Sequence, residues 1–154
     1  PDGHELITYT NGTTGMPANS TTGSQSNNPA NALFIIGFSD WRSTQDDTLW
    51  ATETSANNPC PVGFRVPTET EQNTLVTAAS ITNSASAASS ILKFTVPGFR
   101  DYSDGTLYNV GSYGYYWSSS VNNSYARYRY FNSGGTSTTY DYRAYGFTVR
   151  CLKD

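Results

Sequence analysis

Apolar residues are sparse along this chain and gather in short runs separated by polar, glycine-rich stretches. The run at residues 33–38 is nearly continuous and has the length of a buried strand. Residues 5–10 form a shorter strand candidate, and the chain between the two runs is rich in Gly, Ser, Thr and Asn with two prolines. A segment of this kind buries too little apolar area to offset its ordering entropy. We therefore expect residues 1–31 to form a long loop or an extended arm.

The start of one helix is marked by a specific pair of residues. Thr68 is followed three positions later by Glu71, which is the pattern of a capping box at a helix N-terminus. We predict a helix from this point to about Ala79. Its inner face is predicted to hold Leu75, Val76 and Ala79. The next stretch, residues 80–90, is rich in Ser, Ala, Thr and Asn and predicts either a second, weak helix or a loop.

From residue 91 onward, short apolar and aromatic runs alternate with turn residues. Predicted strands cover residues 92–96, 115–120, 125–131 and 146–152. The sequence Ser-Asp-Gly-Thr at residues 103–106 predicts a hairpin turn, and Gly134 and Gly135 predict another reversal of the chain. One helix followed by an antiparallel set of short strands defines an α+β domain. The length of 154 residues fits a single domain over residues 1–154.

The chain carries little charge, since 14% of its residues are charged and the formal net charge is −3. Its nine basic residues are scattered rather than clustered, so nucleic acid is not an expected partner. No apolar run approaches the roughly 20 residues of a membrane span, and we expect no membrane insertion. Abundant Tyr, Ser, Thr, Asn and Gly resembles extracellular and particle-surface proteins. It also resembles antibody paratopes, in which Tyr provides contact area at low entropy cost.

The two cysteines, Cys60 and Cys151, lie 91 residues apart. The sequence has no Cys-x-x-Cys pair and its only histidine is His4, so the spacing matches no zinc motif. Two interpretations remain open at this point. The cysteines are either two buried free thiols or a disulfide that joins the last strand to the middle of the chain. A disulfide that closes so long a loop is worth about 4–5 kcal/mol in the chain-entropy model.

Other chemistry-bearing residues do not combine into a catalytic or metal-binding motif. The candidates are the serines at residues 118–120, the carboxylate pairs Asp46 with Asp47 and Glu69 with Glu71, and the turn carboxylates Asp101 and Asp104. The serines have no base nearby, because the single histidine lies close to the start of the chain. The first carboxylate pair fits a solvated loop, and the second fits the first turn of a helix, where the dipole favours negative charge. The turn carboxylates are too sparse for a calcium site. We expect no catalytic residues, no obligatory metal ion and no cofactor.

Three motifs, in this order along the chain, resemble a known family. They are NPCPVGFRVPTETE at residues 58–71, GYYWSSS at residues 114–120 and RAYGFTVRCLKD at residues 143–154. They are similar to the Fibrobacter succinogenes major paralogous domain and its relatives, in the C-type-lectin-like and formylglycine-generating-enzyme-like superfamily. They resemble still more the variable proteins of diversity-generating retroelements from gut Bacteroidetes and their phages. The likeness covers about residues 32–154.

The resemblance implies a C-type-lectin-like fold with one main helix and short, mostly antiparallel strands. In this fold the N- and C-terminal strands pair, and the helix follows the Pro-Thr-Glu motif. The resemblance also implies that Cys60 and Cys151 lie close together, which favours the disulfide. The superfamily includes an oxidase that acts through a pair of reactive thiols, but both cysteines of this chain stand at positions that are structural in the relatives. We therefore expect a binding protein and not an enzyme.

In the retroelement proteins, a reverse transcriptase copies a template with errors at adenines, and the copy replaces the 3′ end of the gene. A change at one adenine of the codon AAC gives codons for Tyr, Asp, Ser or Thr. Between residues 121 and 145, 16 of the 25 positions hold Tyr, Asn, Ser, Thr or Asp. The resemblance therefore implies that residues 121–145 form a variable ligand-binding segment.

The tyrosines of this segment allow two interpretations, because Tyr has high β-propensity and can serve packing alone. In residues 125–131, strand alternation puts Arg127 and Arg129 among aromatic rings on one face and leaves Ala126 among aromatic rings on the other. Since both faces mix aromatic groups with small or charged ones, we expect an exposed binding patch. The predicted ligand-binding residues are Asn122, Ser124, Tyr125, Arg127, Tyr128, Tyr130, Asn132, Thr139, Tyr140, Asp141, Tyr142 and Tyr145.

The expected partner is a protein or glycan ligand on a cell surface. The domain would act as a phage receptor-binding protein or as a bacterial surface adhesin, and it would lie outside the cell, on the cell surface or on the virion. The alternative is a structural surface domain of the Fibrobacter lipoprotein type. In that case the segment is not diversified, and its tyrosines serve packing or assembly.

Overall fold

The computed structural model of the chain describes residue 34, residues 39–40, residue 42, residues 44–55 and residues 57–154. The predicted arm over residues 1–31 and the strand candidates at 5–10 and 33–38 lie outside this part, apart from Phe34. Within it, two helices accompany strands that pair antiparallel, which confirms the α+β class. None of the described helices is long and apolar enough to cross a membrane.

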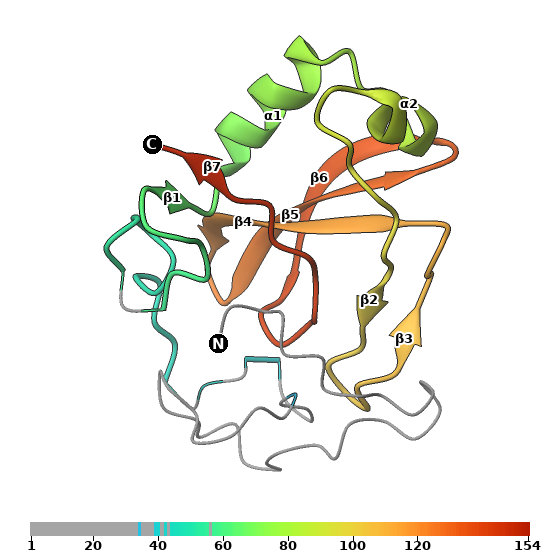
Figure 1. Cartoon of the computed structure of the whole chain (residues 1–154). Helices are drawn as coiled ribbons and strands as arrows, with labels where there is room; N and C mark the ends of the chain where they lie inside the picture. Colours follow the sequence, from blue (N-terminus) through green and yellow to red (C-terminus); the bar gives the residue numbers. More distant parts are fainter. Residues whose placement is uncertain (1–33, 35–38, 41, 43, 56) are drawn as a thin grey trace.

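A three-stranded antiparallel sheet lies at the centre of the fold (Figure 1). Its strands, in spatial order, are β4 (Gly114–Asn122), β5 (Tyr125–Asn132) and β6 (Gly135–Tyr142). Two-residue turns join them in sequence, as expected for tight hairpins. The predictions of strands at 115–120 and 125–131 are confirmed. Strand β6 was not predicted, because its Thr, Ser and Tyr residues show no alternation of apolar and polar positions.

The predicted helix is confirmed as α1 (Glu69–Ala78). The Thr68 side chain accepts a hydrogen bond from the Glu71 backbone, and the Glu71 carboxylate accepts one from the Thr68 backbone, which completes the capping box. Val76 is buried, and Gln72 is buried beside it, where its amide donates to the Trp117 carbonyl at 2.9 Å. Residues 80–90 contain a second short helix, α2 (Ser84–Ser89), so the first of the two alternatives for that stretch is correct.

The two helices pack against β4 and β5 on one face of the sheet and enclose the main hydrophobic core. The core consists of Val76, Ile81, Ala87, Phe94, Tyr116 and Phe131, with Leu92 and Ala79 packed against it. The strand predicted at residues 92–96 is wrong. Lys93 has a positive φ of 50°, and the Thr95 amide donates to the Tyr116 hydroxyl at 2.9 Å instead of to a neighbouring strand. Phe94 is nevertheless buried, so the apolar pattern there indicates burial and not the pairing of a strand.

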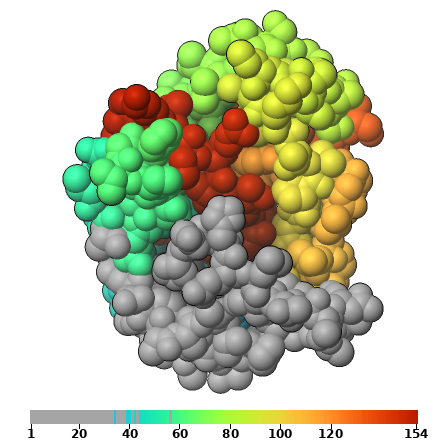
Figure 2. Space-filling view, in the orientation of Figure 1, coloured from blue at the N-terminus to red at the C-terminus, as the bar shows by residue number. Residues whose placement is uncertain are grey.

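The C-terminal segment covers the opposite face of the sheet. In the space-filling view this segment, residues 143–154, fills the space between residues 44–55 and 57–65 on one side and the hairpin of β2 (Phe99–Arg100) and β3 (Leu107–Tyr108) on the other (Figure 2). That hairpin confirms the turn predicted at residues 103–106. The strand predicted at residues 146–152 is not continuous, because isolated bridges occur at Gly146 and Thr148 and strand structure begins only at Leu152. The Phe147 ring fills the space beneath the sheet, with its centroid 4.4 Å from that of Trp117.

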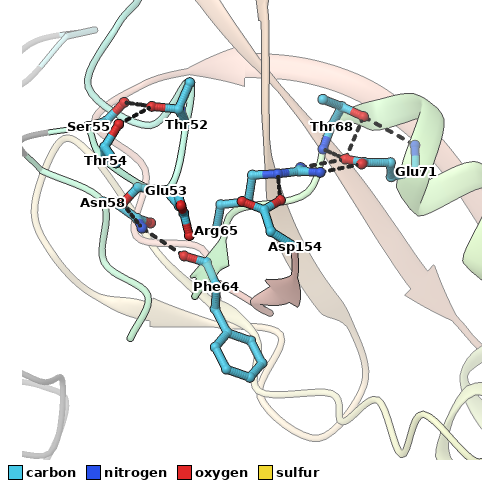
Figure 3. A network of polar contacts seen from close by, with 10 residues as sticks. All are labelled: Thr52, Glu53, Thr54, Ser55, Asn58, Phe64, Arg65, Thr68, Glu71 and Asp154. Carbon is cyan, nitrogen blue, oxygen red and sulfur yellow. Dashed lines mark hydrogen bonds and ion pairs between the residues drawn. The ribbon is translucent and has the colours of Figure 1, made fainter. Parts of the chain in front are cut away.

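The first and last described strands pair with each other. Strand β1 (Phe64–Arg65) lies antiparallel to β7 (Leu152–Lys153), and Cys60 forms a disulfide with Cys151 just outside this pair. The disulfide interpretation is therefore confirmed and the free-thiol alternative is wrong. Figure 3 shows the Arg65 guanidinium between the carboxylates of Glu71 and Asp154, with which it forms ion pairs. These contacts join both strands to the first turn of α1.

Candidate ligand-binding surface

One face of strand β5 lies against helix α1, and each side chain on this face meets a different part of the helix. Arg127 forms an ion pair with Glu69 at 3.5 Å, at the start of α1. Arg129 is buried and donates to the side chain of Asn73, one turn further on. Phe131 is fully buried in the core. Because α1 begins at Glu69, the part of the sheet beyond Arg127 has no helix over it.

Three tyrosine rings gather on that part of the sheet. Tyr125 pairs with Tyr142 across the β5–β6 ladder, and their ring centroids lie 5.4 Å apart in a stacked arrangement. The Tyr140 ring lies 5.2 Å from that of Tyr125, and the Arg127 guanidinium lies 5.7 Å from the centre of the Tyr140 ring. Tyr140 is 47% exposed. We call these four residues, Tyr125, Arg127, Tyr140 and Tyr142, the tyrosine patch.

Tyr128 was predicted to be part of the exposed site, and this prediction is wrong. The residue is only 8% exposed, and its ring packs against Trp117 and Phe147 with centroid distances of 5.8 and 4.6 Å. Burial raises the pKa of its hydroxyl well above the ordinary value, and the nearby Asp141 carboxylate adds to the effect. The side chains of β5 alternate between its two faces as predicted, but both faces are covered at this point. The charged Arg129 on the other face is compatible with burial because Asn73 and Thr136 accept its hydrogen bonds.

The same face as Tyr128 carries several other predicted site residues on β5 and β6. Tyr130, Asn132, Thr139 and Asp141 lie there by strand alternation, and all four are partly exposed. They are therefore separated by the thickness of the sheet from the tyrosine patch. The predicted site thus divides into two faces.

Asp141 is the charged member of this second face. Burial is the main cause that raises the pKa of its carboxyl above the ordinary value, and the neighbouring Asp101 carboxylate adds to the increase. Its one hydrogen bond among the described residues is donated by the Tyr142 backbone, and no Lys or Arg of the described chain forms a salt bridge with it. Tyr145 packs on Phe147, and burial together with Asp141 raises its pKa to about 12.

The remaining predicted residues lie at the turn between β4 and β5, with Asn122 at the end of β4 and Ser124 in the turn itself. Asn122 is partly exposed and Ser124 is exposed. The turn is held from below by Arg143, whose guanidinium donates to the Asn123 carbonyl at 2.9 Å and forms an ion pair with Asp47 at 2.6 Å. These two contacts fix the end of the hairpin next to Tyr125. The side chains of Asn122 and Ser124 lie at the rim of the surface there.

Burial divides residues 121–145 by residue type. Of the sixteen Tyr, Asn, Ser, Thr and Asp residues in this segment, Tyr128 is the single buried one. The other buried residues of the segment are Arg129, Phe131 and Ala144. Strand β6 has no buried residue along its whole length. The residue types expected from mutation at adenines therefore lie almost all at the surface, and three of the nine other residues of the segment are buried.

The serines and carboxylates considered as chemical groups have structural partners. The Ser118 hydroxyl donates to the Arg127 carbonyl, and the Ser120 hydroxyl accepts from the Glu69 backbone. Asp101 and Asp104 accept hydrogen bonds from nearby backbone amides within their own turn. In the described part of the chain, no three His, Cys, Asp or Glu residues gather where they could hold a metal ion.

Two cavities of the described chain are small. One, of about 80 Å³, lies between residues 46–50 and the β4–β5 hairpin, and one of about 110 Å³ lies between α1 and the C-terminal segment. Both are well below the roughly 300–1,000 Å³ of a typical small-molecule site. A wider hollow of about 500 Å³ beside α2 is open to solvent and lined mainly by small or apolar residues, with Lys93 as its charged group. The polar and aromatic groups capable of specific contacts lie on the sheet and not in these spaces.

Sequence reasoning missed the residues that complete the surface on β6, above all Thr136 and Thr138. The signal that could have found them is the tight turn after β5, because such a turn requires an antiparallel partner of similar length. Sequence reasoning also missed Gln72 and Asn73, which reach the sheet from α1. The polar side chain of Gln72 gave no sign of a buried position, and that of Asn73 gave no sign of a contact with a buried arginine.

The geometry defines a small disulfide-bonded α+β domain with an aromatic, polar sheet surface. Residues 60–152 match a family described as "Domain of unknown function (DUF8237)". This match covers more than half of the sequence, and the chain belongs to that family. Neither a curated protein nor a solved structure matches the chain.

Proposed function

We propose that this protein is a ligand-binding domain whose β5–β6 hairpin presents a diversified surface to a protein or glycan on a cell surface. The observation that carries the proposal is the division of residues 121–145 by burial. Fifteen of the sixteen residues of the mutable types are at least partly exposed, whereas three of the four buried residues are of other types. A surface built in this way can change its side chains while the core stays constant.

The tyrosine patch has the chemistry of a binding surface. Tyrosine rings provide apolar contact area together with a hydroxyl that can donate or accept a hydrogen bond. The stacked pair of Tyr125 and Tyr142 is ordered before a ligand arrives, so little entropy is lost on binding. Arg127 adds a positive charge beside Tyr140. Asn122 and Ser124 at the rim add adaptable polar contacts.

We propose further that the fold is C-type-lectin-like and that the domain belongs to the variable proteins of diversity-generating retroelements. Three features support this proposal. The first and last described strands pair, a helix follows the Pro-Thr-Glu motif, and a disulfide joins Cys60 to Cys151. On this account the domain works outside the cell, on a bacterial surface or at a phage tail, and it is not an enzyme. The hydrogen bonds that engage Ser118 and Ser120 within the fold favour the last point.

Two matched display libraries test the proposal without knowledge of the natural ligand. The first randomises the tyrosine patch, Tyr125, Arg127, Tyr140 and Tyr142. The second randomises the buried residues Tyr128, Arg129, Phe131 and Ala144. Both are displayed on yeast, and folding is measured as resistance to protease before selection on a labelled test protein such as ovalbumin.

We expect most members of the first library to resist protease and to yield binders to the test protein, because the randomised side chains lie outside the core. We expect most members of the second library to be degraded. Equal loss of folding in the two libraries would contradict the proposal, since the tyrosine patch would then be part of the packing. A folded first library without binders would favour the structural surface domain.

A further inference from the structure

The exposed edge of the central sheet points to the kind of ligand that the surface accepts. We propose that the outer edge of β6 binds an extended polypeptide segment as a fourth strand of the sheet, with a basic side chain of that segment placed against Asp141. The inference rests on the proposed ligand-binding function and deepens it, because it selects a protein ligand over a glycan.

The main-chain groups of β6 alternate between its neighbour and solvent. The tight turn after β5 closes on the pair Asn132 and Gly135, which exchanges hydrogen bonds, and every second pair along the ladder does the same. The amide and carbonyl groups of Thr136, Thr138 and Tyr140 therefore point away from β5. Within the described chain, no backbone hydrogen bond from outside the ladder reaches these three residues. The one side-chain contact to this edge is a 3.5 Å approach of the Ser137 hydroxyl to the Thr138 carbonyl.

The opposite edge of the sheet is closed by the chain itself. On β4, Tyr116 bridges to Thr148 and Gly114 bridges to Gly98. At the end of β6, the Tyr142 amide binds the Asp141 carboxylate, and the Tyr142 carbonyl accepts the Tyr145 amide. The open part of the edge is therefore confined to residues 136–140.

Edge strands of natural proteins are usually protected against pairing by lysines, prolines or bulges. Strand β6 has none of these, because its sequence is GTSTTYDY and its register with β5 is continuous. Threonine and tyrosine have high β-propensity. An edge of this composition is a template for another strand. Since strand addition uses main-chain hydrogen bonds for affinity and side chains for specificity, it tolerates variation of the β6 side chains.

Asp141 supplies the charge complementarity. Its own main-chain groups face β5, so a residue of an added strand opposite Asp141 would stand in a pair without hydrogen bonds, in which the side chains lie closer together. The carboxylate is half-buried and has no cationic partner in the described chain. A Lys or Arg at the opposite position would provide one. On the other face of the added strand, an apolar or aromatic side chain would meet Tyr140 and Tyr142.

A second copy of this chain is the competing occupant, and the same charge argues against it. Two β6 strands paired antiparallel about Thr138 would place Asp141 opposite Gly135 of the other copy. The carboxylate would then become more buried without gaining a cation, which is unfavourable. A ligand strand with a basic residue avoids this cost.

The test uses random linear 12-residue peptides displayed on phage and selected on the immobilised full chain. The affinity of a selected synthetic peptide is then measured for the wild type, Thr138→Pro and Thr138→Val. Proline at residue 138 removes an outward amide and leaves the ladder to β5 intact, because proline is accepted at the solvent side of an edge strand. Valine keeps the amide and is the matched control. Circular dichroism and the melting temperature establish that each variant is folded.

We expect Thr138→Pro to weaken peptide binding by about tenfold or more, the equivalent of one to two lost hydrogen bonds, and Thr138→Val to leave it nearly unchanged. We expect selected peptides to alternate in polarity and to carry a Lys or Arg whose contribution is lost in Asp141→Asn. Amide exchange at residues 138 and 140 should slow when the peptide binds. If Thr138→Pro unfolds the domain, methylation of alternate peptide amides provides the same test from the ligand side.

Binding that is insensitive to Thr138→Pro and to peptide methylation, but lost in Tyr140→Ala, would overturn the strand-addition inference and leave the proposed binding function standing. Self-association of the wild type that Thr138→Pro abolishes would assign the edge to a second copy and also overturn it. Binding to a glycan array without any selected peptide would have the same consequence. Constant codons across residues 121–145 in a natural population would instead contradict the diversified function and leave a peptide site of fixed specificity.

Discussion

The ring of Tyr128 lies 4.6 Å from the ring of Phe147, measured between centroids, at an angle of 61°. This contact joins the Tyr-rich segment to the C-terminal segment from within the fold. On the neighbouring strand, Tyr140 is 47% exposed and stands over Arg127. Two tyrosines of the same segment therefore have different functions, one in packing and one at the surface.

Replacing each of these tyrosines with alanine separates the two functions. Tyr128→Ala should lower the free energy of unfolding by about 3–5 kcal/mol, because it leaves a cavity among large aromatic rings. Tyr140→Ala should change it by about 0.5 kcal/mol or less, as is usual for an exposed residue. Urea denaturation of the two variants and the wild type measures both values. A similar, large loss for Tyr140→Ala would place its ring in the core and contradict the tyrosine patch.

Reduction of the Cys60–Cys151 disulfide should destabilise the domain strongly. The bond closes a loop with a sequence separation of 91 and holds the β1–β7 pair together. Its loss is expected to cost about 4–5 kcal/mol in the chain-entropy model. The measurement is the melting temperature of the wild type with and without reductant, and of the double variant Cys60→Ser with Cys151→Ser. A melting temperature that the reductant leaves unchanged would show that the bond contributes nothing to stability.

Glu71 should give the domain an acid-sensitive stability. The hydrogen bond from Arg65 is the main cause that lowers the pKa of its carboxyl from 4.5 to about 2, and hydrogen bonds from Thr68 add to the effect. A folded-state pKa below the unfolded value stabilises the fold fully above the unfolded value. This stabilisation is lost as the pH falls from about 4.5 towards 2.

Glu71→Gln keeps the capping box, which accepts Gln, but removes the ion pair with Arg65. Between pH 5 and pH 2, the free energy of unfolding of this variant should therefore fall less steeply than that of the wild type. The difference in slope should correspond to about one titrating group. Glu53→Gln, at an exposed position, is the control and should leave the wild-type slope. An unchanged slope in Glu71→Gln would mean that the Arg65 contact has no energetic effect.

Two glycines with positive φ separate backbone strain from steric contact. Gly98 has a φ of 72°, and a Cβ there would lie 2.1 Å from the Tyr108 carbonyl oxygen, whereas Gly111 has a φ of 80° with nothing within 4 Å. Alanine at either position should lower the free energy of unfolding by about 1–2 kcal/mol, because it would have to adopt the left-handed conformation. Gly98→Ala should cost about 1–3 kcal/mol more because β3 must move. Equal losses in thermal denaturation would mean that the β2–β3 hairpin adjusts freely.

The elements that could be predicted from the sequence are those with a local chemical signal. The capping pair of Thr68 and Glu71 locates the start of α1, and the Asp-Gly pair before Thr106 locates a hairpin turn. The motif resemblance favoured the disulfide, which no spacing rule could decide. These features depend on neighbouring residues or on a recognised pattern, so the rest of the fold need not be known.

The features that could not be predicted depend on what packs against a segment. Residues 92–96 have the pattern of a strand, but Tyr116 takes the hydrogen bond that a ladder would need. Arg129 is charged and still buried, because α1 supplies Asn73 as an acceptor. Strand β6 is polar on both faces, since neither helix covers it. In the candidate site, the tyrosines could be predicted as a group, but the burial of Tyr128 could not, because it depends on the position of Phe147.

The central claim is that a constant core carries a surface that changes between individuals, and deep sequencing of this gene across a population of its host tests it most directly. The account predicts that substitutions concentrate in the codons for residues 121–145, almost all at adenines, and that the codons of the buried Phe131 and Ala144 remain constant. A segment as uniform as the rest of the gene would contradict diversification, and the exposed tyrosines would then belong to a binding or structural surface of fixed sequence.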